Sequence, residues 1–195
     1  MDDNLIIFTS VGKVELIRHS LDVDFLAAVA RGCKNPNPPK KTCAENDQLV
    51  ASLYKLGHLS VFEFGDAVFK VSCPIFVARQ LMRYRTGKYC EKSLRATTVE
   101  KKPIDDDDPF VLHYNASVDF YNALIARGFK REEARRVLPL DTPTSYYFKI
   151  DGRNLCHIIE ERSTKATQSE TRETVAAMRD LIKLAAPRFS DAVGL

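Results

Sequence analysis

The chain has 195 residues, enough for one domain with a sizeable core, and its hydrophobic (45%) and charged (28%) fractions are ordinary for a soluble globular protein. A formal net charge of +3 is too small to indicate nucleic-acid binding by itself. No stretch approaches the roughly 20 consecutive apolar residues that a helix needs to span a bilayer, so no membrane-spanning helix is predicted.

The N-terminal residues and the cysteines indicate an intracellular protein. Residues 1–4 (Met-Asp-Asp-Asn) lack the basic n-region of a secretory signal. The five cysteines are odd in number, widely spaced and without a CxxC pair, so neither a disulfide framework nor a zinc site is predicted. We expect reduced thiols and a cytoplasmic protein. The compact length would also suit a viral gene, in which case the location would be the host cytoplasm.

The first half of the chain predicts three strands and two helices. The strands are residues 5–9, 14–17 and 62–71, and the helices are residues 22–30 and 44–56. Asp22 is typical of a helix N-cap, and Gly57 is typical of a helix end. Three prolines make residues 35–41 a loop, because proline lacks the N–H and the φ freedom that a helix interior requires.

The second half predicts mainly helices. They are residues 75–85 with Pro74 in the first turn, 110–125, 132–138, 154–162 and 168–185, beside one strand at 146–150. Gly87 should end the first of them, and the Pro187 region should end the last. Residues 88–98 are expected to be an ordered loop. Residues 101–109, with four consecutive aspartates, should be a solvated excursion.

Helices interleaved with few strands indicate an α/β or α+β mixture, and we expect a single domain over residues 1–195. The most informative segment is residues 79–95, which carries six cations against one acid, Glu91. Such a local cluster in a nearly neutral chain indicates a compact anionic ligand rather than a long polyanion. A solvated basic helix end is the alternative, which the apolar residues of 75–81 weaken because they indicate burial.

The spacing within this segment suggests how a ligand would be held. Gln80 and Arg83 are three residues apart and share a helix face. After Gly87, Glu91, Ser93 and Arg95 occupy alternate positions, which point the same way in an extended loop. A hydroxyl, a guanidinium and backbone N–H groups are the partners that a phosphate monoester requires.

Several motifs resemble the flavin-dependent thymidylate synthase (ThyX) family, as a divergent member. The family's hallmark is Arg-His-Arg followed after seven residues by Ser, and this chain has Arg83-Tyr84-Arg85 and then Ser93. Residues 58–63 resemble its His-x-Ser/Thr-x-Phe-Glu stretch, and residues 134–139 resemble its Ala-Arg-x-x-Leu-Pro. Further matches lie at Arg153, Leu155, Arg162, Gln168 and Glu170. A match in the same order over about residues 57–170 is far more specific than one short motif.

The resemblance implies an α+β fold of the thymidylate-synthase-complementing-protein type, with mixed helices around a small central, largely antiparallel sheet. It also implies a homotetramer whose sites combine residues of neighbouring subunits. The implied FAD contacts are Ser60, Glu63, Arg83, Tyr84, Arg85, Glu91, Asp151, Arg153 and His157. The implied nucleotide contacts are Gln80, Arg83, Glu91, Ser93, Leu94, Arg95, Arg135 and Arg162. No metal site is implied.

The implied reaction is the methylation of dUMP at C5 to dTMP, with FAD as cofactor and with methylenetetrahydrofolate and NADPH as co-substrates. Arg162 would face the pyrimidine and stabilise the negative charge that develops on it. Ser93 is the other candidate catalytic residue. We favour a phosphate contact with Arg95 and Arg135 over a nucleophilic role for Ser93, because no histidine lies near it in sequence to act as a base. We interpret the nearby Cys90 as an ordinary loop residue rather than a thiol nucleophile.

Departures from the family pattern fall mostly on the flavin side. Tyr84 replaces the central histidine, and Cys90, His157 and Ala166 replace other typical residues. Three alternatives follow: a hydroxymethylase that makes 5-hydroxymethyl-dUMP, a degenerate member that binds nucleotide without turnover, and a basic RNA-binding module. The absence of Gly-rich RNA motifs argues against the last. Uracil and cytosine both stay open as the base.

Overall fold

The computed structural model describes residues 5–103, 105 and 107–195. The expectation about residues 1–4, and the parts of the 101–109 prediction that concern Ile104 and Asp106, lie outside the described residues. Within those ranges, no helix is both long enough and apolar enough to cross a membrane.

A single antiparallel sheet organises the described chain. Its strands are β1 (Leu5–Thr9), β2 (Gly12–His19), β3 (Asp66–Pro74), β4 (Lys88–Glu91) and β5 (Pro143–Asp151), in the order β1-β2-β3-β5-β4. Alternate residues of β3 are buried and the residues between them are partly buried, so one face of the sheet forms the core and the other is partly exposed. The small antiparallel sheet among helices confirms the predicted α+β class.

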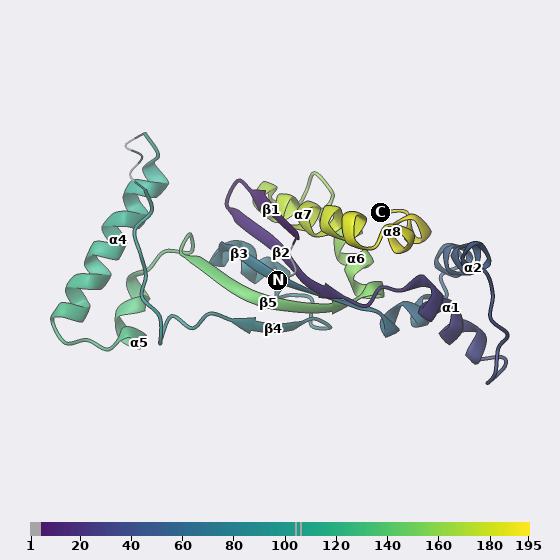
Figure 1. The fold of residues 1–195 in the computed structure, drawn as a ribbon. Helices are drawn as coiled ribbons and strands as arrows, with labels where there is room; N and C mark the ends of the chain where they lie inside the picture. The colour runs from purple at the N-terminus through teal and green to yellow at the C-terminus, as the bar shows by residue number, and fades with distance from the viewer. Residues whose placement is uncertain (1–4, 104, 106) are drawn as a thin grey trace.

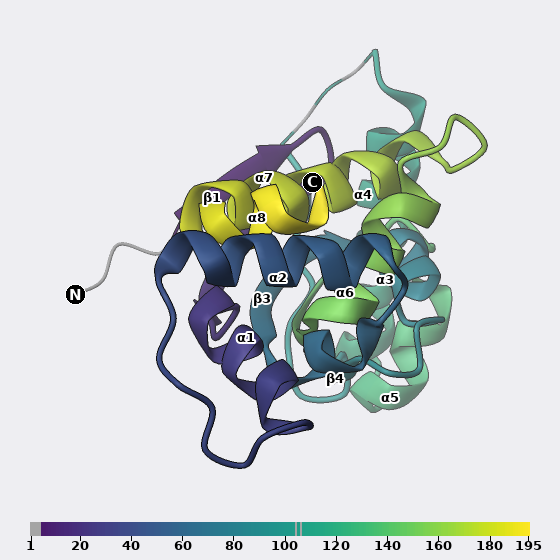
Figure 2. The ribbon, with the colours of Figure 1, turned by 90° about the vertical axis from the view of Figure 1, so that its right-hand side faces the viewer.

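Helices cover the buried face and both ends of the sheet (Figure 1). They are α1 (Val23–Gly32), α2 (Cys43–Lys55), α3 (Ile75–Leu81), α4 (Pro109–Ala126), α5 (Arg131–Ala134), α6 (Gly152–Arg162), α7 (Ser169–Ala185) and α8 (Pro187–Val193), with 3-10 turns η1 (Leu59–Phe64) and η2 (Arg135–Val137). Helix α7 packs on β1 and β2, and α2 packs on α1 and α8, in front of the sheet in Figure 2.

Local chemistry explains several helix ends. The Asp22 carboxylate accepts the N–H groups of Asp24 and Phe25, as predicted for an N-cap of α1. Thr42 and Glu45 form a reciprocal capping box on α2, and Gly57 follows that helix with a φ of 76°. These contacts satisfy backbone groups that a helix terminus leaves without partners.

Helices α4 and α5 stand apart from the sheet, at the opposite end of the molecule from α1 and α2 (Figure 1). They have a small core of their own, made by Val99, Tyr114, Val118, Tyr121 and Ala134. The aspartate run before α4 is not only solvated acid, because Asp108 caps α4 by accepting the N–H groups of Phe110 and Val111.

Four predicted elements differ from the structure. Residues 62–64 belong to η1 rather than to a strand, and β3 begins only at Asp66. Helix α3 ends at Leu81 instead of near residue 85. Residues 88–91 form strand β4 and not a loop, because they pair with β5. The region of Pro187 starts a further helix, α8, since proline fits the first turn of a helix as well as it ends one.

Candidate functional site

The pairing of β3 with β5 decides where the candidate residues lie. The two strands pair in register from Asp66 with Asp151 to Pro74 with Pro143. Because they are antiparallel, η1 and α6 meet at one end of the pair, whereas α3 and the chain after η2 meet at the other. Strand β4 runs alongside β5 from Lys88, opposite Lys149, to Glu91, opposite Tyr146.

A pocket of about 720 Å³, here called the η1–α6 pocket, lies at the first of these ends. Its lining includes Tyr54, Leu59, Glu63, Thr86, Asp151, Arg153, Asn154, His157 and Glu160. Four of these residues, Glu63, Asp151, Arg153 and His157, were predicted from the resemblance as FAD contacts. The structure therefore brings together residues that lie almost a hundred positions apart in sequence.

Interactions within the η1–α6 pocket fix two of its polar groups. The Arg153 guanidinium pairs with the Glu63 carboxylate at 2.5 Å, which joins α6 to η1. The Asp151 carboxylate accepts the backbone N–H of Asn154 at 2.9 Å and thereby caps α6. Asp151 thus caps α6 in addition to its predicted contact with FAD.

Tyr84 lies beside this pocket at the centre of a polar cluster. Its hydroxyl donates to the Glu161 carboxylate at 2.6 Å and accepts the Arg162 Nε–H at 2.7 Å. The His157 ring meets the Tyr84 ring edge-on, and His157 Nε2 lies 3.5 Å from Glu161 Oε2. Burial and the hydrogen bond to Glu161 raise the pKa of Tyr84 to about 12, so its hydroxyl keeps its proton at neutral pH.

A second pocket, of about 540 Å³, lies where α3 meets the chain after η2, and is here called the α3–η2 pocket. Its lining comprises Ile75, Ala78, Arg79, Met82, Glu91, Lys92, Leu94, Arg135, Arg136, Leu138, Pro139 and Leu140. Glu91, Leu94 and Arg135 are predicted nucleotide contacts. Four cations line the pocket against one carboxylate, and Glu91 accepts a hydrogen bond from the Thr144 hydroxyl at 2.8 Å. The lining suits a small anion.

The remaining predicted phosphate contacts lie on the turn after β4. The Ser93 hydroxyl oxygen accepts the N–H of Arg95 at 3.3 Å, and both residues are exposed. The Arg95 guanidinium binds Glu132, with Nε and NH2 at 3.1 and 2.9 Å from the same carboxylate oxygen. Since Glu132 is three residues from Arg135, this pair holds the turn against the segment that carries Arg135.

Other predicted residues do not line either pocket. Ser60, Arg83 and Arg85 are exposed, and neither arginine forms an ion pair with the residues that the structure describes. Gln80 donates from its amide to Gln168 at 2.6 Å. Arg162 lies in neither lining and is held by Tyr84 instead. One chain therefore brings only some of the predicted nucleotide contacts together in one pocket.

Several residues of these clusters were not among the predicted contacts. Arg79, Lys92 and Arg136 line the α3–η2 pocket. The signal for Arg79 and Lys92 was the local density of cations in residues 79–95. Thr144 and Glu161 touch predicted residues. Neither residue belongs to a recognisable sequence motif, because the residue that each one contacts is distant in sequence.

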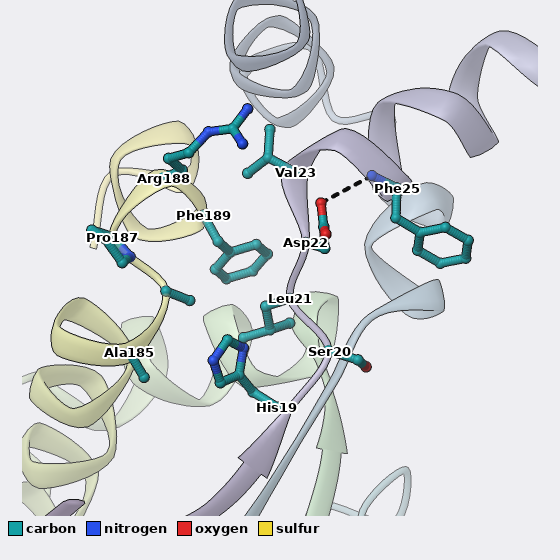
Figure 3. Close-up of a pocket in the computed structure, with 11 residues that line it drawn as sticks. His19, Ser20, Leu21, Asp22, Val23, Phe25, Ala185, Pro187, Arg188 and Phe189 are labelled. Carbon is teal, nitrogen blue, oxygen red and sulfur yellow. Dashed lines mark hydrogen bonds between the residues drawn. The ribbon is translucent and has the colours of Figure 1, made fainter. Parts of the chain in front are cut away.

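A third cavity, of about 550 Å³, lies between the end of β2 and the start of α8 (Figure 3). Leu21 and Phe189 face it, and the Asp22 carboxylate there accepts the N–H of Phe25. Arg188 points toward α2 and binds Asp24. No predicted site residue lines this cavity, and several of its polar groups serve helix capping and ion pairing.

Two of the five thiols are removed from solvent and three are exposed. Cys73 and Cys156 are buried, and burial raises the pKa of each thiol to about 12, which makes them inert. Cys90 is exposed on β4 opposite Tyr147. Among the residues with described placement, no group of three or more His, Cys, Asp or Glu side chains could hold a metal ion.

Comparisons with known proteins agree with this arrangement. The sequence profile of the thymidylate synthase complementing protein family, Thy1, matches residues 15–188. A flavin-dependent thymidylate synthase of Wolbachia pipientis wMel is 31% identical over 171 residues, which cover 73% of this chain and 60% of that protein. The enzyme of the same name from Thermus thermophilus is 31% identical over 170 residues, covering 75% and 63%. The chain thus spans less than two thirds of the length of these relatives.

One solved structure has the same fold. The crystal structure of a UMP/dUMP methylase, PolB, from Streptomyces cacaoi, bound with 5-Br dUMP, superposes with a TM-score of 0.82. The superposition covers 97% of this chain and 95% of that one, at 23% sequence identity. It confirms the fold type that the sequence motifs predicted.

Proposed function

The chain belongs to the thymidylate synthase complementing protein family, and from this membership we propose that it is a flavin-dependent one-carbon transferase that methylates dUMP at C5 to form dTMP. The observation that carries the proposal is the α3–η2 pocket. Four cationic side chains line it, and its one carboxylate accepts a hydrogen bond from Thr144. A nucleoside monophosphate has a compact dianion that such a lining attracts.

The residues of the η1–α6 pocket fit part of a flavin dinucleotide. At about 720 Å³ the pocket lies within the range of small-molecule sites, roughly 300–1,000 Å³. It offers apolar surface from Leu59 and Tyr54 and donors from Arg153 and His157. Arg85, which precedes the pocket residue Thr86, has no acidic partner in the described part of the chain and can serve a pyrophosphate. When bound, FAD would supply hydride chemistry, with NADPH as the reductant and methylenetetrahydrofolate as the source of the one-carbon unit.

The chain's own residues would then bind and orient the nucleotide. Arg135, with Ser93 and Arg95 on the adjacent turn, would hold the phosphate and so fix where the ring lies. Arg162 would stabilise the charge that accumulates on the pyrimidine as C5 becomes nucleophilic, since its guanidinium is already fixed before the reaction begins. Ser93 would position the phosphate and would not act as a nucleophile.

A product assay tests the proposal. The purified protein is incubated with dUMP, methylenetetrahydrofolate, NADPH and FAD, and the nucleotide product is identified by mass spectrometry. We expect dTMP, and none when any one of the four components is omitted. A product with one additional oxygen would indicate the hydroxymethylase, and dUMP binding without any product would indicate a degenerate family member. A parallel assay with dCMP identifies the base.

We also propose that the protein works as a homotetramer whose sites combine residues from neighbouring subunits. Support comes from the distribution of the predicted contacts, which one chain divides between the η1–α6 pocket, the α3–η2 pocket and exposed positions such as Ser60 and Arg83. A second copy could bring these groups together.

A further inference from the structure

Arg162 is held by a short chain of hydrogen bonds that begins at a carboxylate. Glu161 Oε2 accepts the Tyr84 hydroxyl proton at 2.6 Å, and the Tyr84 oxygen accepts the Arg162 Nε–H at 2.7 Å. The Arg162 guanidinium carbon also lies 5.3 Å from the centre of the Tyr84 ring, within the range of a cation–π contact. The hydrogen bond and the cation–π contact therefore connect the same pair of side chains.

The direction of each hydrogen bond follows from the number of protons. A neutral tyrosine hydroxyl has one proton, and Glu161 takes it. The lone pairs of the Tyr84 oxygen are then left for Arg162, so the carboxylate decides which way the hydroxyl faces. On the other side, His157 lies 3.5 Å from the same carboxylate oxygen and limits its movement. This chain of hydrogen bonds, here called the relay, connects Glu161 through Tyr84 to Arg162, and both end residues lie on α6.

This arrangement leaves the substrate-binding edge of Arg162 available. Only the Nε–H is engaged, and within the described ranges no other side-chain hydrogen bond or ion pair of Arg162 is found. The two terminal nitrogens, with their four N–H groups, can therefore donate hydrogen bonds to a ligand. Fixing Nε also fixes the plane of the guanidinium, because that group is rigid and flat.

We infer that Tyr84 and Glu161 are positioning residues for Arg162, and that their hydrogen-bonded relay fixes the guanidinium plane toward the pyrimidine of the bound nucleotide. The inference rests on the proposed function, because that function assigns Arg162 to the pyrimidine. It gives Tyr84 a role that differs from the flavin contact expected at the same position. Glu161, which no motif marks, becomes part of the site.

The test uses four variants of the full chain: Tyr84→Phe, Glu161→Leu, Glu161→Gln and the double variant Tyr84→Phe/Glu161→Leu. Tyr114→Phe is the matched control, since its hydroxyl donates to the Glu100 carbonyl in the separate core beside α4. Steady-state kinetics with dUMP give kcat and KM for each variant. The NMR signal of the Arg162 Nε–H, assigned by its absence in Arg162→Lys, reports the hydrogen bond without any turnover.

We expect Tyr84→Phe and Glu161→Leu each to lower kcat roughly tenfold while KM for dUMP changes less than about threefold, as for lost transition-state stabilisation. Glu161→Gln should retain most of the activity, because its amide oxygen still accepts the hydroxyl proton. The double variant should be no worse than Tyr84→Phe, since both residues act through one contact. The Nε–H signal should shift or exchange away in Tyr84→Phe and persist in Tyr114→Phe.

Additive losses in the double variant, or an unchanged Nε–H signal in Tyr84→Phe, would overturn the inference and leave the proposed function intact. A wild-type protein that forms no dTMP would overturn the proposed function. In that case the Nε–H signals of Tyr84→Phe and Glu161→Leu still show whether the hydrogen bonds exist. The inferred role of these bonds in orienting Arg162 toward a pyrimidine would be refuted together with the proposed function. Thermal melts of all variants exclude loss of fold as the cause.

Discussion

Four cationic side chains share the α3–η2 pocket, but they should not contribute equally to nucleotide binding. Arg135 combines the pocket position with the family motif and with the neighbouring Arg95–Glu132 pair. We expect Arg135→Ala to weaken dUMP binding by roughly tenfold or more, the loss of one hydrogen bond to a charged group. Isothermal titration calorimetry measures the change in Kd.

Arg131→Ala is the matched control for this prediction. Arg131 is an exposed arginine on α5, four residues before Arg135, and it lines none of the pockets described here. Its removal changes the net charge by the same amount and should leave Kd within about twofold of wild type, because exposed charges are screened. Equal losses in the two variants would show that only net charge matters.

Single residues were predictable where a motif marked them. Glu63 and Arg153 were matched to the family by local sequence, and the structure places them in one pocket. His157, which departs from the family's typical residue at an implied FAD position, lines the same pocket. Thr144 and Glu161 were not predictable, because their partners lie 53 and 77 residues away in sequence. Thr144 lies inside a strand and Glu161 follows another glutamate on a helix, so neither has a local sequence pattern that predicts its contact. The contacts exist only in the folded chain.

At the scale of elements, one arginine ties α8 to both N-terminal helices. Arg188 binds the Asp24 carboxylate of α1 through two nitrogens, at 2.8 and 2.9 Å, and Asp47 of α2 at 2.8 Å. All three side chains are partly exposed, so the network should contribute only about 1 kcal/mol. We expect Arg188→Gln to lower Tm by about 2–4 °C at pH 7, measured by calorimetry.

The effect of Arg188→Gln should depend on pH in a definite direction. The hydrogen bond from Arg188 lowers the pKa of Asp24 well below its usual range. The pair therefore adds stability above the unfolded-state pKa of about 4 and loses it as the pH falls below that value. The Tm difference should shrink toward zero in acid. Arg179→Gln, whose ion pair is with the adjacent Asp180, should show little difference at any pH.

Elements were predictable from sequence where their stabilising contacts are local. Asp22, Gly57 and the helix of α7 follow from capping and periodicity within a few residues. Strand β4 was missed because three of its four residues are exposed, so no hydrophobic alternation marks it. Residues 88–91 form a strand because their backbone pairs with β5, which lies more than 50 residues later in the sequence. Residues 62–64 were assigned to a strand because their apolar residues continue those of β3.

At the scale of the whole molecule, the proposed assembly predicts complementation between inactive variants. Arg135→Ala damages the α3–η2 pocket and Arg153→Ala damages the η1–α6 pocket. At dUMP and FAD concentrations below the wild-type binding constants, each variant alone should retain about a tenth of wild-type activity or less. If one site takes the two arginines from different subunits, random mixed tetramers should recover roughly a quarter of wild-type activity. Co-expression with two different tags, followed by tandem purification and the dTMP assay, measures the recovery.

Light scattering of the mixed sample supplies the necessary control. It should give four chains per particle for wild type and for the mixture. A mixture that forms tetramers but stays at the activity of the single variants would place both arginines of a site on the same chain. A particle of one chain would refute the proposed homotetramer itself.

The turn between α3 and β4 has a consequence for how such a protein can diverge. The Tyr89 hydroxyl lies 2.8 Å from the Leu81 carbonyl and 2.9 Å from the Tyr84 carbonyl, and the Gly87 N–H also donates to Tyr84. A Cβ at Gly87 would come within 2.5 Å of Phe148, which stacks on Tyr89. The main chain at position 84 is thus anchored without help from its own side chain. A histidine at position 84, as in the family pattern, would leave these backbone contacts in place while it changed the side-chain chemistry of the site.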